Sequence, residues 1–367
     1  SEMCIRDRKY TFIGYLTTLI PFIIFPYYCV IGGWVTKYAL VSIQGGIHDA
    51  ASDTFFTGFI SKSAEPMIYV LVFLIVTTLV VAGGVKGGIE RVSTIMMPVL
   101  IVLLIGVSVF CITRPGAMAG VAYYIKPNLK DFSPTTILAA LGQLFYSMSL
   151  AMGIMVTFGS YMPKKSNLEK SVTQVEIFDT GVAFLAGLMI VPAVFIFSNG
   201  DSSMLAKGPS LMFVMLPKVF NSMAFSSIIA AVFFILVLLA ALTSSISLLE
   251  TLVAVLMDKF HMKRGTACIT MFIIALLLAV PSSLGFGAWS NITILGFDFL
   301  DFFDFISNSV LMPIAAFLTC IFVGYIIKPK EIIDEVEVSG EFKRKPLFLV
   351  MVKYIACLLY TSDAADE

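Results

Sequence analysis

The sequence has 367 residues, of which 59% are hydrophobic and 13% are charged. A water-soluble domain is about 45–50% apolar and about 25% charged, so this chain carries more apolar surface than soluble cores can bury. The 24 basic residues balance the 24 acidic ones, so no basic excess points to a nucleic-acid partner. Two histidines leave little for a catalytic or zinc-binding cluster. The composition predicts an all-α protein that crosses a lipid bilayer several times and is not an enzyme.

The two ends of the chain differ from its body. Residues 1–8 (SEMCIRDR) and 357–367 (CLLYTSDAADE) resemble translated sequencing-adapter read-through, and we expect them to be non-native tails. Residues 9–356 are predicted to form a single, partial transmembrane domain, because the second tail interrupts an apolar run that is too short to cross a bilayer.

Nine segments are apolar enough for membrane helices, each of which needs about 20 mostly apolar residues. They are residues 10–43, 66–84, 89–112, 134–161, 168–198, 226–258, 266–285, 300–327 and the interrupted 346–360. With the start of the first segment in the cytoplasm, the cytoplasmic loops carry roughly twice as many Lys and Arg as the opposite loops. The positive-inside rule therefore predicts a multi-pass protein of the cell membrane with the residue 9 end in the cytoplasm.

The fourth predicted segment gathers small and hydroxyl-bearing residues. These are Gly142, Ser147, Ser149, Gly153 and Gly159. Irregular backbone at bilayer depth is tolerated only where it lines a cavity or is buried in protein, so the pattern indicates a candidate broken helix. In the alternative interpretation the helix is unbroken and packs closely on its neighbours through the small residues.

The segment 226–258 carries oxygen atoms on one face. Four of its residues are spaced i, i+3, i+4 and i+7, which places them on the same side of a helix. They are Ala240, Thr243, Ser244 and Ser247. Hydroxyl and carbonyl oxygens are the ligands that a dehydrated hard cation such as Na⁺ needs. Alternatively, the hydroxyls bond to carbonyls of their own preceding helical turn.

Acidic residues fall within or at the ends of several predicted spans. An acid inside a membrane is costly and indicates a functional site. Glu176 lies near the cytoplasmic end of its segment and can reach water, whereas Asp179 lies deeper. The remaining acids are Glu250 in the segment 226–258 and, at the outer end of the segment 300–327, Asp298, Asp301 and Asp304. These last three form either a functional stripe or a solvated helix end.

Several motifs in the body of the chain occur together in one known family. They are PYYCVIGGW at 26–34, KGGIERVS at 86–93, LGQLFYSMSL at 141–150, GPSLMFVMLP at 208–217 and LTSSI at 242–246. With these motifs in order, the chain resembles the neurotransmitter:sodium symporter family over roughly residues 10–356, and most of all its bacterial sodium-dependent amino-acid transporters.

The resemblance implies a leucine-transporter-type inverted-repeat bundle, in which the nine segments correspond to helices 3–11. Helices one and two would then be missing, and we expect the fragment itself not to transport. For the intact protein the resemblance implies secondary active transport, in which sodium drives import of an amino acid by alternating access.

The resemblance also carries residue roles onto this chain. It implies a substrate site at Ile24, Tyr28, Tyr146, Ser147, Ser149, Met152 and Leu248. In this site the Tyr28 hydroxyl binds the substrate carboxylate. For the outer gate it implies Gln143 and Asp304, with Asp301 as the alternative acid.

Two sodium sites are implied in the same way. The first takes Ser147 and Asp179, and the second takes the carbonyl of Ala240 with Thr243 and Ser244. Na⁺ is thus the expected cofactor.

Chloride use is expected to differ from that of animal relatives, which need the ion and bind it partly through a serine one turn past the position of Asp179. Ala183 stands at that position and has no hydroxyl. The fixed carboxylate of Asp179 can supply the negative charge instead, because an opposite charge stabilises a neighbouring cation. We therefore expect chloride-independent transport.

The apolar pocket residues predict a neutral substrate with an apolar or aromatic side chain. The alternative function is transport driven by protons or another cation in a different family of the same fold. A membrane enzyme is disfavoured because no catalytic set can be assembled around the two histidines. A channel or a purely structural bundle would leave Asp179 and the oxygens at 240–244 without a role.

Overall fold

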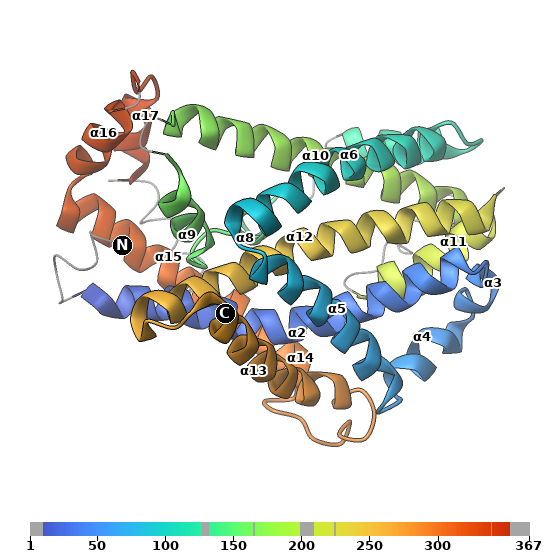
Figure 1. Ribbon diagram of the computed structural model, residues 1–367. Helices are drawn as coiled ribbons and strands as arrows, with labels where there is room; N and C mark the ends of the chain where they lie inside the picture. Colours follow the sequence, from blue (N-terminus) through green and yellow to red (C-terminus); the bar gives the residue numbers. More distant parts are fainter. Residues whose placement is uncertain are drawn as a thin grey trace.

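The computed structural model is a bundle of helices (Figure 1). It describes residues 10–126, 132–163, 166–198, 209–223, 225–338 and 340–352. Within these ranges the isolated bridge between Ile294 and Phe297 is the sole β pairing, so the predicted all-α class is confirmed. The predicted tails at 1–8 and 357–367 lie outside the described residues.

Seven helical segments in the described residues are long and apolar enough to cross a membrane. They are α2 (Thr11–Ile43), α5 (Glu65–Ala82), η2 with α6 (Val85–Ile112), α10 (Leu168–Phe197), α12 (Ser226–Phe260), α13 (Arg264–Leu284) and α14 through η6 (Phe299–Ile327).

The sequence predicts nine spans. The two that are not among these seven continuous helices of the described residues have identifiable reasons. The fourth predicted span is divided into two helices that are each too short to cross a bilayer alone. The last, 346–360, is described only as far as residue 352, where helix α17 (Lys345–Val350) has just ended.

The predicted break in the fourth segment is confirmed. Helix α8 (Pro134–Ser147) ends, six residues follow without regular helix, and α9 (Ile154–Tyr161) begins. In this gap Ser149, Ala151 and Gly153 have φ angles of 54°, 60° and 72°. The left-handed region costs a non-glycine residue roughly 1–2 kcal/mol, so the helix cannot continue through it. Strain of this kind gathers at functional sites.

Helix α2 lies at the centre of the bundle. In its most apolar stretch 67% of residues are buried, against 22–39% in the other six spans. It makes its most extensive contacts with α12 and α5, and α12 runs beside it in Figure 1. A Cβ atom on Gly33 would lie 2.8 Å from the backbone nitrogen of Val70, so glycine at this position permits the close approach of α5.

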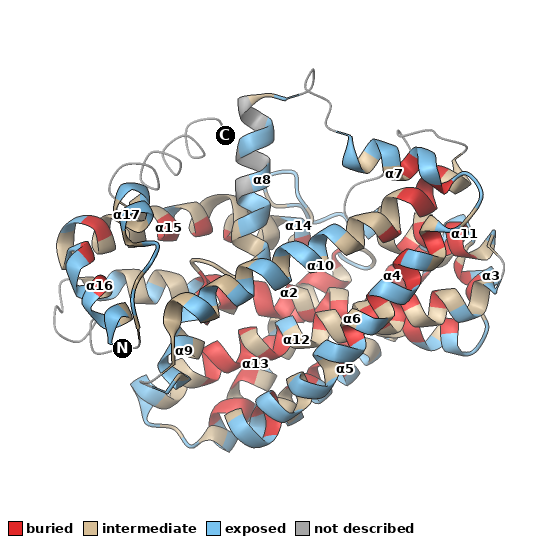
Figure 2. Ribbon diagram, turned by 90° about the horizontal axis from the view of Figure 1, so that it is seen from above, coloured by how far each residue is buried: buried red, intermediate tan, exposed pale blue. Residues whose placement is uncertain are grey.

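The outer faces of the bundle remain apolar. Figure 2 shows buried residues gathered on α2, α12 and α11 (Leu216–Asn221), while α10 is largely exposed or intermediate. Large apolar side chains such as Val102 and Leu277 are exposed by 68% and 65%. Exposed apolar faces on this scale fit contact with lipid rather than water.

Short helices collect at the two ends of the bundle (Figure 1). At one end Lys218 of α11 pairs with Asp53 of α4 (Asp53–Ile60), and Asn221 contacts His48 of α3 (Ile47–Ala50). The other end holds α9, α16 (Pro329–Glu337) and α17. Loops predicted to share one side of the membrane therefore lie together.

Candidate functional site

The helix break lies next to a pair of polar side chains. Ser147 is the last residue of α8, and its hydroxyl donates a 2.5 Å hydrogen bond to Oδ1 of Asp179 on α10. Both residues were assigned to the first sodium site, and the structure brings them together although they are 32 positions apart. A carboxylate that accepts one hydrogen bond keeps lone pairs for a cation. This pair can therefore supply two oxygen ligands at the end of the half-helix.

The oxygens predicted on α12 fall into two groups. The hydroxyls of Thr243 and Ser247 donate to the carbonyls of Ala240 and Thr243, at 2.8 and 3.1 Å, as the backbone-bonded alternative expected. Ser244 is exposed instead, and its hydroxyl interacts with Tyr28 of α2. The hydroxyl assigned to the substrate carboxylate thus lies beside the helix assigned to the second sodium site.

The side chains predicted to surround the substrate's apolar part share one hydrophobic cluster. Ile24, Met152 and Leu248 are buried in it, with 1%, 3% and 4% of their surfaces exposed. Tyr146 packs against the same cluster and interacts with Tyr28. These residues come from α2, from the end of α8 with the break that follows it, and from α12, so three distant parts of the sequence meet around one region.

Ser149 lies within the gap between α8 and α9, where its positive φ makes it part of the break itself. It is partly exposed.

The three residues predicted for the outer gate differ in their exposure and in their contacts. Asp304, the last residue of α14 (Phe299–Asp304), accepts a 2.9 Å hydrogen bond from the Tyr27 hydroxyl. Asp301 is exposed, and its backbone N–H is capped by the Asp298 carboxylate at 2.8 Å. Between the two alternatives, only Asp304 thus contacts α2 beside the pocket residues. Gln143 is exposed on α8.

Glu250 belongs to a buried ionic cluster that the sequence did not reveal. It has no exposed surface and forms a two-pronged ion pair with the Arg264 guanidinium at the start of α13. The Tyr161 hydroxyl at the end of α9 donates to the same carboxylate at 2.7 Å, and Arg264 Nε donates to the Val81 carbonyl of α5 at 2.8 Å. The Glu250 carboxylate of α12 thereby joins α9 and α13 directly, and α5 through Arg264.

Glu176 behaves as its position in the sequence suggested. Its carboxylate pairs with Arg344 at 2.8 Å, and both side chains are more than 40% exposed. The carboxylate raises the pKa of the Arg344 guanidinium above its ordinary value. Such an exposed pair contributes little to stability, so no functional role follows.

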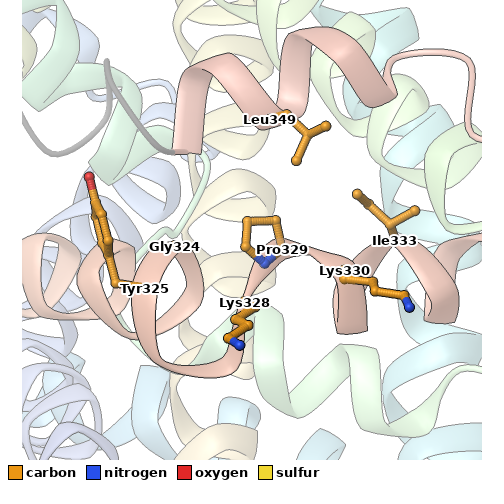
Figure 3. Close-up of a pocket in the computed structure, with 7 residues that line it drawn as sticks. All are labelled: Gly324, Tyr325, Lys328, Pro329, Lys330, Ile333 and Leu349. Carbon is orange, nitrogen blue, oxygen red and sulfur yellow. The ribbon is translucent and has the colours of Figure 1, made fainter.

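A separate cavity of about 630 Å³ lies near η6 and the start of α16. Its lining residues are Gly324, Tyr325, Lys328, Pro329, Lys330, Ile333 and Leu349. Figure 3 shows Leu349 on one side of these lining residues and Lys328 and Lys330 on the other, with the ammonium groups of both lysines turned away from Leu349. The lining contains none of the residues predicted for substrate or sodium, so this cavity is distinct from the candidate site.

A membrane helix that is broken beside oxygen-bearing side chains and a buried apolar cluster is the arrangement of a secondary transporter. The comparisons with known proteins identify the family. A sequence model of the sodium:neurotransmitter symporter family matches residues 51–362, and the chain belongs to this family. It is therefore a multi-pass, sodium-dependent membrane transporter and not an enzyme, as the sequence predicted.

Individual relatives agree with this assignment. An uncharacterized sodium-dependent transporter of Haemophilus influenzae is 36% identical over 330 residues, which are 88% of this chain and 71% of that protein. One from Bacillus subtilis is 36% identical over 338 residues, which are 91% of this chain and 74% of that protein. The crystal structure of MhsT in complex with L-phenylalanine superimposes with a TM-score of 0.85 and 38% identity, covering 96% of this chain and 80% of MhsT. The predicted leucine-transporter-type fold is confirmed.

Proposed function

We propose that the protein imports a neutral amino acid with an apolar or aromatic side chain across the cell membrane, driven by two sodium ions and without chloride. The observation that carries the proposal is the helix break, with the Ser147–Asp179 pair at one edge and buried Met152 within it. Irregular backbone at bilayer depth is tolerated where it serves a cavity, and transporter sites are built from such half-helices.

The substrate class rests on the side chains around the break. Ile24, Met152 and Leu248 offer apolar contact, and the Tyr28 hydroxyl, which interacts with Ser244, is the proposed partner of the substrate carboxylate. Methionine is flexible and polarizable, which suits more than one substrate shape. The similar protein MhsT was crystallised with L-phenylalanine, which supports a substrate of the same class here.

The proposed coupling is energetically sufficient. One charge moving through 100 mV gains about 2.3 kcal/mol. Two sodium ions therefore gain about 4.6 kcal/mol, which at about 1.4 kcal/mol per tenfold sustains a concentration ratio of some three decades. With the residue 9 end in the cytoplasm, the gradient drives import.

Uptake of radiolabelled leucine into proteoliposomes that contain the protein tests the proposal. We expect saturable uptake that disappears when choline replaces sodium. Unlabelled Leu, Met, Phe or Trp should compete, and Asp or Lys should not, because the apolar pocket leaves a second charge unpaired. Uptake that follows a proton gradient in sodium-free buffer, or stronger competition by Asp and Lys, contradicts the proposal.

Replacing chloride by gluconate tests the anion requirement. We expect uptake to stay unchanged, because the Asp179 carboxylate at Ser147 holds a fixed negative charge beside the proposed sodium ion. Asp179→Asn is the matched variant: it keeps the shape but loses the charge, and the sodium concentration for half-maximal uptake should rise. Collapse of wild-type uptake without chloride would show that Asp179 does not play this part.

A further inference from the structure

The carboxylate of Asp304 is held on one of its two oxygens. Oδ1 accepts hydrogen bonds from the Tyr27 hydroxyl at 2.9 Å and from the Asn308 side-chain amide at 2.5 Å. Because both bonds end on Oδ1, Oδ2 keeps its lone pairs for a further donor. The two bonds fix the plane of the carboxylate and so determine where Oδ2 points.

Tyr27 reaches Asp304 from a different helix and is held firmly. Its side chain is 1% exposed within α2, and a buried tyrosine hydroxyl requires a polar partner. Ser307 lies 3.4 Å from the same hydroxyl and is itself bonded to the Phe303 carbonyl at 2.7 Å. Tyr27, Ser307 and Asn308 thus form a polar cluster with Asp304.

The backbone after Asp304 supports this arrangement. The chain passes from α14 into the π-helix η5 (Phe305–Leu311), which contains both Ser307 and Asn308. A π-helical turn contains more residues than an α-helical one and is frequent at functional sites. Here it follows directly on Asp304, so the irregular turn and the polar cluster coincide.

Tyr27 is also the neighbour in sequence of Tyr28, which we place in the substrate site. Consecutive residues of a helix point about 100° apart, so the two tyrosines reach different partners. Tyr28 interacts with Ser244 on α12, and Tyr27 bonds Asp304 on α14. Tyr146, at the end of the broken helix, interacts with both tyrosines.

We propose that Tyr27 is a positioning residue, which orients the Asp304 carboxylate and links that orientation to occupancy of the substrate site through Tyr28 and Tyr146. The proposal rests on the proposed function and adds a residue to it. A carboxylate held in one plane can close over bound substrate without first losing rotational freedom. Removing the Tyr27 hydroxyl should therefore weaken apparent substrate binding more than it slows turnover at saturation.

Tyr27→Phe tests this, because it removes the hydroxyl and keeps the ring. We expect the KM for substrate to rise about tenfold, as befits one hydrogen bond to a charged group, while the maximal rate changes less than twofold. In an Asp304→Asn background the same substitution should change KM no further, because no carboxylate is left to orient.

Tyr38→Phe is the matched control. Tyr38 lies on the same helix with no exposed surface, and its hydroxyl donates to the Phe213 carbonyl at 2.8 Å, away from Asp304. The Tyr38→Phe variant loses a buried hydrogen bond of a tyrosine hydroxyl, as Tyr27→Phe does, so any general loss of stability appears in both variants. We expect the KM of this variant to stay at the wild-type value.

Three results would overturn the inference. The first is that the KM of Tyr27→Phe equals that of Tyr38→Phe. The second is that the effects of Tyr27→Phe and Asp304→Asn on KM multiply independently. The third is that Asn308→Ala, which removes the other bond to Oδ1 without altering α2, leaves KM unchanged. The proposed function fails separately, when the wild-type protein shows no sodium-dependent uptake at all.

Discussion

Arg264→Met is expected to lower the free energy of unfolding by about 3–5 kcal/mol, the cost of leaving one partner of a buried ion pair unpaired. Glu250 has no exposed surface, and Arg264 supplies both prongs of its ion pair as well as a bond to the Val81 carbonyl. Methionine keeps an unbranched side chain of similar reach but no charge. Thermal unfolding of the purified protein in detergent, followed by tryptophan fluorescence, measures the loss.

Lys259→Met is the control at the same end of α12. Lys259 donates to the Tyr15 hydroxyl at 2.7 Å and lies 4.0 Å from the centre of that ring, but the contact is exposed. An exposed cation–π contact contributes about 0.5–1 kcal/mol. Adding Glu250→Gln to Arg264→Met should recover part of the loss, because no buried charge is then left unpaired. Equal, small shifts for the two methionine variants would mean that water reaches Glu250.

The fold was predictable from the sequence where local chemistry determines it. Apolar runs defined the spans, and the small and hydroxyl-bearing residues of the fourth run predicted its break, where Gly153 adopts a positive φ. At that same place the predicted span is made of two half-helices, each of which is shorter than a bilayer requires.

The contacts of the site were less predictable, because they join distant positions. Ser147 and Asp179 were named by the family resemblance, but their direct hydrogen bond depends on how α8 and α10 pack. Tyr27 and Asp304 are 277 residues apart, and no local pattern marks Tyr27 as different from Tyr28. The signal that was present is the paired tyrosine itself, because two adjacent buried hydroxyls require two separate partners.

Ser244→Ala and Thr243→Val are expected to raise the sodium concentration for half-maximal uptake between tenfold and a hundredfold. Each removes one hydroxyl ligand from the proposed second sodium site and changes side-chain shape very little. A hydrogen-bond-like contact to a charged group contributes roughly 1.5–3 kcal/mol, and about 1.4 kcal/mol is tenfold in affinity. Thr243 donates its proton to the Ala240 carbonyl, which leaves lone pairs on both oxygens to face a cation.

Ser245→Ala separates ion binding from helix packing. Ser245 is fully buried, and its hydroxyl bonds to Thr77 on α5 at 2.9 Å and to the Leu242 carbonyl at 2.9 Å, so it points away from the proposed ion. Its loss should lower thermal stability while sodium dependence stays at the wild-type value. Ser244 is exposed toward Tyr28, so Ser244→Ala should show the opposite pattern, with sodium dependence shifted and stability retained. If the sodium dependence of uptake is the same in Ser244→Ala, Thr243→Val and Ser245→Ala, the hydroxyls of α12 serve helix packing alone and the second sodium ion does not bind there.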